Sequence, residues 1–142
     1  MSGEDIGTKT KNARYTMNRN VMQMQIYRCD FDHEEFNKKI SDFCSISRID
    51  DATKRNIELA FEELVQNNIA VFIEHNDERG MPIDITLEHY GLYDGARMTV
   101  SYGGERYDPV YDGDELSSLM VKKLFKSIKH TYNDTNVIVI AF

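Results

Sequence analysis

An acid and an amide four residues apart, Glu63 and Asn67, are the strongest candidates for chemistry in this chain. They lie in the segment 56–72, whose apolar residues recur at the spacing of an amphipathic helix. Residues four apart stack one turn above the other on a helix, so both side chains are expected at the edge of the apolar stripe. Packed neighbours could hold the pair at the mouth of a cleft. Spacing alone also allows the alternative, a solvated polar flank of an ordinary helix.

Composition limits the kinds of partner. The chain has 142 residues, with 17 basic and 24 acidic side chains and a net charge of −7. This balance argues against binding to nucleic acid or to an acidic membrane surface. The chain has no apolar run long enough to span a bilayer, and its polar N-terminus does not resemble a secretory signal. We therefore expect a cytoplasmic protein whose two cysteines, Cys29 and Cys44, stay reduced.

The elements that must position the pair begin after a polar stretch. Residues 1–19 lack periodicity and predict a flexible tail, which leaves 20–142 as a single domain. Residues 21–28 alternate apolar and polar side chains, as a half-buried strand does. Asp32 followed by Glu35 predicts the capped start of a helix, and Asp50 or Asp51 is expected to cap the 56–72 helix. The side chains expected to be buried on these two helices are Phe36, Ile40, Phe43 and Cys44, then Ile57, Phe61, Leu64, Val65, Val71 and Phe72.

The second half of the chain supplies more strands. Alternation predicts strands over 83–90 and 97–102 joined by a turn at Asp94–Gly95, and the apolar run 136–142 predicts a buried strand. Apolar spacing over 116–130 predicts a third long helix. The expected fold class is α+β, a two-layer α/β sandwich with a mixed, mostly antiparallel sheet and three helices on one face.

The order of elements and three segments resemble a known superfamily. The segments are Phe61–Asn67 (FEELVQN), Thr99–Pro109 (TVSYGGERYDP) and Glu115–Val121 (ELSSLMV). Together they resemble the histidine-kinase-like ATPases, also called the GHKL or Bergerat-fold superfamily, and within it the small bacterial anti-sigma-factor serine kinases. The resemblance implies an ATP-binding regulatory domain that uses Mg-ATP. It places Glu63 where the family has the catalytic acid of phosphoryl transfer, and Asn67 where the family has the amide ligand of Mg²⁺.

The remaining family positions are altered. Tyr102 stands where the family has the aspartate that accepts a hydrogen bond from adenine, so it is either a nucleotide contact or an inward aromatic that fills the core. Gly104 matches the first glycine of that motif, but Arg106 replaces the second. Glu115 and Ser117 stand where the family has the glycines that hold the phosphates.

Two functions therefore remain open. One is a nucleotide-binding regulator with serine/threonine kinase-like activity, in which Asn67, Tyr102, Gly104, Arg106 and Ser117 bind the nucleotide. The other is a non-catalytic interaction module that has lost ATP binding and acts on a sigma factor, on an antagonist or on its own copy. A homodimer formed through an exposed strand at 97–102 is one form of this alternative.

Overall fold

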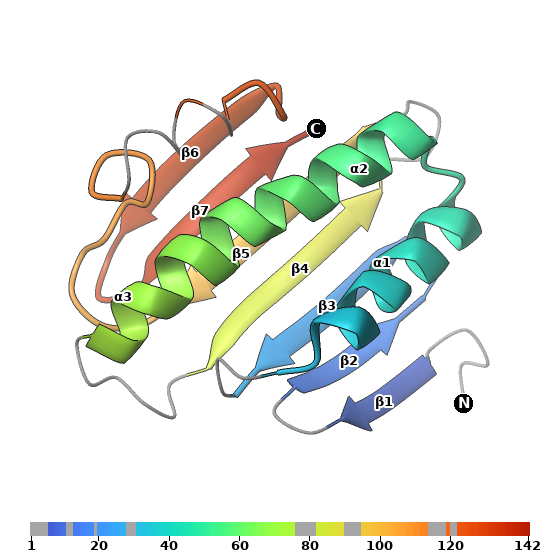
Figure 1. The fold of residues 1–142 in the computed structure, drawn as a ribbon, viewed down its shortest axis with the longest axis horizontal. Helices are drawn as coiled ribbons and strands as arrows, with labels where there is room; N and C mark the ends of the chain where they lie inside the picture. The colour runs from blue at the N-terminus through green and yellow to red at the C-terminus, as the bar shows by residue number, and fades with distance from the viewer. Residues whose placement is uncertain are drawn as a thin grey trace.

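The computed structural model describes residues 6–10, 13–18, 20–27, 31–75, 82–89, 95–113, 119 and 122–142. They form one seven-stranded sheet in the order β1-β2-β3-β4-β5-β7-β6, with the helices packed on one face (Figure 1). The strands are β1 (Ile6–Thr10), β2 (Ala13–Met17), β3 (Val21–Ile26), β4 (Ile83–His89), β5 (Ala96–Tyr102), β6 (Ser127–Tyr132) and β7 (Asn136–Ala141). The helical segments are α1 (His33–Ser47), α2 (Asp51–Ala60), η1 (Phe61–Ile69) and α3 (Ala70–His75).

The α+β class and the two-layer arrangement are confirmed, with two corrections. Neighbouring strands in the described part of the sheet all run antiparallel, so the sheet is not mixed. The helical layer consists of α1 and one rod made of α2, η1 and α3, rather than three separate helices (Figure 1). No helix among the described residues is long and apolar enough to cross a bilayer.

The prediction of a flexible tail over 1–19 was wrong for the described residues 6–10 and 13–17. These residues form β1 and β2, and β2 pairs with β3 in register from Ala13 opposite Ile26 to Met17 opposite Met22. Ala13, Tyr15 and Met17 alternate with polar residues and are buried. A strand with only three apolar residues on one face has a largely polar composition. Its alternation of apolar and polar side chains is then the signal that distinguishes it from a tail.

The two predicted helix starts are confirmed. The Asp32 side chain accepts a hydrogen bond from the Glu35 backbone N–H at 3.1 Å, and the Asp50 side chain accepts one from Thr53 at 2.7 Å. Each carboxylate thereby satisfies one of the backbone donors that the first turn of a helix leaves unpaired. The residues predicted to be buried on the first helix, from Phe36 to Cys44, are buried on α1.

The rod differs from the predicted 56–72 helix at both ends and in its middle. It extends from Asp51 to His75, and its central nine residues, η1, form a π-helix with wider turns than an α-helix. Because its turns are wider, η1 changes which of the residues toward the end of the rod face the sheet. Ile69 and Ile73 are buried, whereas Val71, which an unbroken α-helical period places in the stripe, is 41% exposed.

The helix predicted over 116–130 is wrong for residues 122–130, although residue 119 is helical. Residues 122–126 form turns and 127–132 form β6, which pairs with β7. The turn between β6 and β7 has Asp134 at φ 61°, a left-handed conformation that Asp tolerates better than most residues. The β-hairpin therefore overrides the helical spacing of the apolar residues, since β7 offers Ile128 and His130 buried partners at Ile140 and Ile138.

The sheet has a covered face and an open face. The residues on the covered face alternate along each strand with those on the open face and contribute most of the buried core. On the open face, Thr16, Gln23, Thr86 and Thr99 occupy consecutive paired positions from β2 to β5. Strand β5 lies between β4 and β7, so the exposed edge predicted at 97–102 for self-association does not exist.

Candidate functional site

The structure places the two strongest sequence candidates side by side on η1. The Asn67 side-chain amide donates a hydrogen bond to the Glu63 carboxylate at 3.4 Å. Asn67 is exposed and Glu63 is partly buried. The expected adjacency is therefore present.

The loop 103–113, which follows β5, contacts the rod at the positions next to this pair. The Tyr107 ring stacks on Phe72 of α3 with ring centroids 4.1 Å apart and planes at 12°. Gly113 lies against the Asn68 side chain and the Pro109 carbonyl so closely that a Cβ would clash with both. Asn68 is buried and also donates a hydrogen bond from its side chain to the carbonyl of Glu63. The loop is thus packed directly on the rod through Asn68 and Phe72.

Tyr102, the last residue of β5, is part of the core. Its side chain is 1% exposed, and its hydroxyl donates to the Tyr107 carbonyl. Burial raises the pKa of the Tyr102 phenol, and the nearby Asp108 carboxylate raises it further. Of the two interpretations of Tyr102 left open by the sequence, this position matches the inward aromatic that fills the core.

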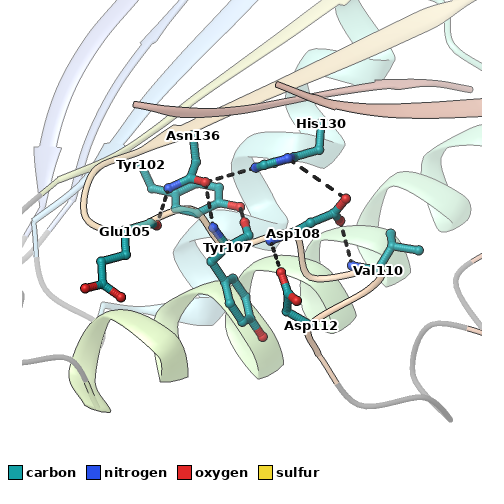
Figure 2. Close-up of polar contacts among 8 residues, drawn as sticks. All are labelled: Tyr102, Glu105, Tyr107, Asp108, Val110, Asp112, His130 and Asn136. Carbon is teal, nitrogen blue, oxygen red and sulfur yellow. Dashed lines mark hydrogen bonds and ion pairs between the residues drawn. The ribbon is translucent and has the colours of Figure 1, made fainter. Parts of the chain in front are cut away.

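A polar network anchors the loop to the end of the sheet (Figure 2). Its centre is Asn136, the first residue of β7, which is 0% exposed. The Asn136 side-chain oxygen accepts the Tyr107 backbone N–H at 2.8 Å, and its side-chain nitrogen donates to the Glu105 carbonyl at 2.9 Å. The Asn136 side chain therefore fixes the backbone of the loop at two positions, Glu105 and Tyr107.

His130 of β6 extends this network to Asp108. Its Nε2 lies 2.9 Å from Asn136 Oδ1, and its Nδ1 lies 3.9 Å from Asp108 Oδ2 (Figure 2). Asp108 in turn organises the next turn of the loop, because its other carboxylate oxygen accepts the Val110 N–H at 3.0 Å and its backbone N–H donates to Asp112 at 2.9 Å. Both the His130 and the Asp108 side chains are largely buried.

Two of the other predicted nucleotide contacts, Gly104 and Arg106, lie on the loop 103–113. Gly104 has φ 91°, which suits glycine, and its carbonyl accepts a hydrogen bond from the Tyr132 hydroxyl at 3.1 Å. Arg106 is exposed. Ser117 and Glu115 lie outside the described residues.

Sequence reasoning missed Asn136, His130 and Asn68. Asn136 had a signal, a polar residue in phase with Ile138 and Ile140 on the inward face of an apolar strand. His130 was assigned to a helix and therefore to the wrong neighbours. Asn68 also had a signal, since it follows Leu64 by four residues and Val65 by three and so lies on the apolar stripe even of a regular helix.

Comparison with models of protein families yields no match, and no curated protein is a significant match to the chain. No group of three or more potential metal-binding residues lies close together in the part of the chain that the structure describes.

The described residues do not fit ATP in the way that the superfamily resemblance implies. Tyr102, at the position where the resemblance places the adenine-binding acid, is a phenol that is buried and already bonded to the loop. Stacking of Tyr107 on Phe72, and the close approach of Gly113 to Asn68, put protein atoms between the loop and the rod. A purine would have to displace this packing and leave the Tyr107 carbonyl without its buried partner.

Proposed function

We propose that this chain is a cytoplasmic, non-catalytic regulatory domain related to the histidine-kinase-like ATPases, which acts by binding another protein and has lost ATP binding. The partner class that the resemblance suggests is a sigma factor or an antagonist of one. The observation that carries the proposal is the position of Tyr102, whose buried side chain closes the site of the adenine contact and bonds the loop that would otherwise cover a nucleotide.

The anchored loop also supports a binding role. At its outer end Tyr111 is 86% exposed, although the neighbouring backbone is fixed by hydrogen bonds from Tyr111 and Asp112 to the Asp108 carbonyl. Exposed tyrosines on an ordered backbone are favourable contact residues, because a large apolar ring is buried at little cost in conformational entropy. We place the partner contact on this loop, with Tyr111 at its centre.

The first test is thermal unfolding with millimolar Mg-ATP and, separately, Mg-ADP. A ligand at one hundred times its Kd stabilises a protein by about 2.7 kcal/mol, which for a domain of this size raises Tm by about 8 °C. We expect a change below about 1 °C. A rise of several degrees that is lost in Asn67→Ala would contradict the proposal and establish nucleotide binding at the η1 pair.

The second test concerns the loop. Affinity capture with the wild-type chain is compared with capture by Tyr111→Ser and by Ile46→Ser, which removes an exposed apolar side chain on α1. We expect one protein to be recovered by the wild type and by Ile46→Ser and lost with Tyr111→Ser. Equal recovery by all three chains would contradict this placement. Light scattering over a range of concentrations distinguishes a homodimer from binding to another protein.

A second candidate function is Mg-nucleotide binding by Glu63 and Asn67. It is supported by the adjacency of the two accessible side chains and by the π-helix that carries them, a rare geometry that is frequent at functional sites. In this case the nucleotide would contact the rod without occupying the Tyr102 position. The Mg-ATP titration with Asn67→Ala separates this candidate from the first.

A further inference from the structure

The hydrogen-bond partners of Asn136 determine the protonation of one side of His130. The Tyr107 backbone N–H can only donate and the Glu105 carbonyl can only accept, so the orientation of the Asn136 amide is determined. Its Oδ1 is the atom that faces His130 Nε2 at 2.9 Å. Because this oxygen is an acceptor, Nε2 must carry a proton.

The other ring nitrogen also faces an acceptor. His130 Nδ1 lies 3.9 Å from the Asp108 carboxylate, and both side chains are largely excluded from solvent, at 4% and 10% exposed. A neutral imidazole has a proton on one nitrogen only, so here it would direct the Nδ1 lone pair at a carboxylate. The doubly protonated imidazolium donates toward both acceptors and neutralises the carboxylate charge.

We propose that His130 is a protonation-controlled latch, whose imidazolium joins Asn136 to Asp108 and thereby holds the loop 103–113 on the end of the sheet. Loss of the second proton removes the attraction to Asp108 and weakens the turn that Asp108 holds through the Val110 N–H. The latch is closed while His130 carries both ring protons and Asp108 is ionised. The inference concerns the loop itself and holds whether or not the proposed function is correct.

Other ionisable groups surround this network. Asp112 faces the network from the loop, since its carboxylate accepts the Asp108 N–H. Tyr102 from β5 and Tyr107 from the loop have raised pKa values, because burial and the two aspartates disfavour their ionised forms, so they remain neutral. Tyr132 on β6 bonds through its hydroxyl to the Gly104 carbonyl.

The test is an NMR pH titration of the full chain that follows the His130 ring and the backbone amides of Tyr107 and Val110. We expect the two amides to change with the same midpoint as the ring, and their protection factors against hydrogen exchange to be about tenfold higher when His130 is protonated, the effect of the ion pair with Asp108. Amides that do not respond across the His130 titration would overturn the proposal.

Three variants make the test specific. His130→Gln keeps one donor for Asn136 and should abolish the midpoint from both amides, whereas His33→Gln, which removes a histidine whose ring contacts Gln66 on η1, should leave it in place. Asp108→Asn should move the His130 midpoint to lower pH, because the protonated ring loses its countercharge. An unchanged His130 midpoint in Asp108→Asn, or an unchanged amide midpoint in His130→Gln, would refute the latch.

Discussion

Replacing Asn136 with alanine tests whether one buried side chain anchors the loop to the sheet. The substitution removes the acceptor of the Tyr107 N–H at 2.8 Å, the donor to the Glu105 carbonyl at 2.9 Å and the partner of His130 Nε2 at 2.9 Å. Glu105 is exposed and its carbonyl can regain water, so its loss is small. The Tyr107 N–H and the His130 ring lie in part-buried surroundings, and each group left unpaired costs about 1–3 kcal/mol.

The free energy of unfolding of Asn136→Ala should therefore fall by about 2–5 kcal/mol. For a domain of this size Tm falls by about 3 °C per kcal/mol, which gives a decrease of about 6–15 °C. The assay is urea unfolding followed by circular dichroism, together with a thermal scan. Asn133→Ala is the matched control, because Asn133 is an exposed asparagine in the adjoining β6–β7 turn, and it should cost less than about 0.5 kcal/mol. A loss below about 1 kcal/mol for Asn136→Ala would refute the anchoring role.

Four further outcomes follow from three residues, Cys44, Gly104 and Asp32. Burial, with a smaller contribution from a nearby acid, raises the pKa of Cys44 from 9.0 to about 12, so in a Cys29→Ser background its alkylation at pH 8 should be far slower in the folded than in the urea-unfolded chain. The unfolded thiol loses its proton first as the pH rises, so the Cys44 contribution to stability should decline from pH 9.0 to about pH 12, and a Cys44→Ala variant should lack this decline. Gly104→Ala should destabilise the chain by about 1–2 kcal/mol because of its φ of 91°, whereas Gly103→Ala should change little; equal effects in urea unfolding would contradict the assignment. Asp32→Ala should lower the free energy of unfolding by about 1 kcal/mol through loss of the α1 cap, and an unchanged urea midpoint would show that the 3.1 Å bond contributes nothing.

Local signals were sufficient for much of the fold. Alternating side chains predicted β3, β4 and β5, an apolar run predicted β7, and the acid at each N-cap predicted where the helices begin. These features are readable because their cause lies within a few residues, in the period of a strand or in the unpaired donors of a first turn. The pairing of β4 with β5 likewise agrees with the predicted hairpin, whose turn at Asp94 lies outside the described residues.

The wrong predictions concern segments whose conformation depends on residues distant in the sequence. β6 has apolar residues at helical spacing, yet it forms a strand because β7 supplies a row of backbone partners and a buried surface. The phase of the rod beyond η1 depends on the π-helical turns, which bury Ile73 and expose Val71. Periodicity calculated for a regular α-helix cannot detect that change.

The same distinction between local signals and distant contacts applies to the candidate site. The sequence by itself determined that Glu63 and Asn67 would be neighbours, since four residues on a helical segment place two side chains together in most helical geometries. Only the tertiary structure decided that Tyr102 is buried, that the loop rests on Asn68 and Phe72, and that Asn136 joins two strands to that loop. The physical reason is that hydrogen bonds between residues far apart in the chain depend on strand order and register, which no local pattern specifies.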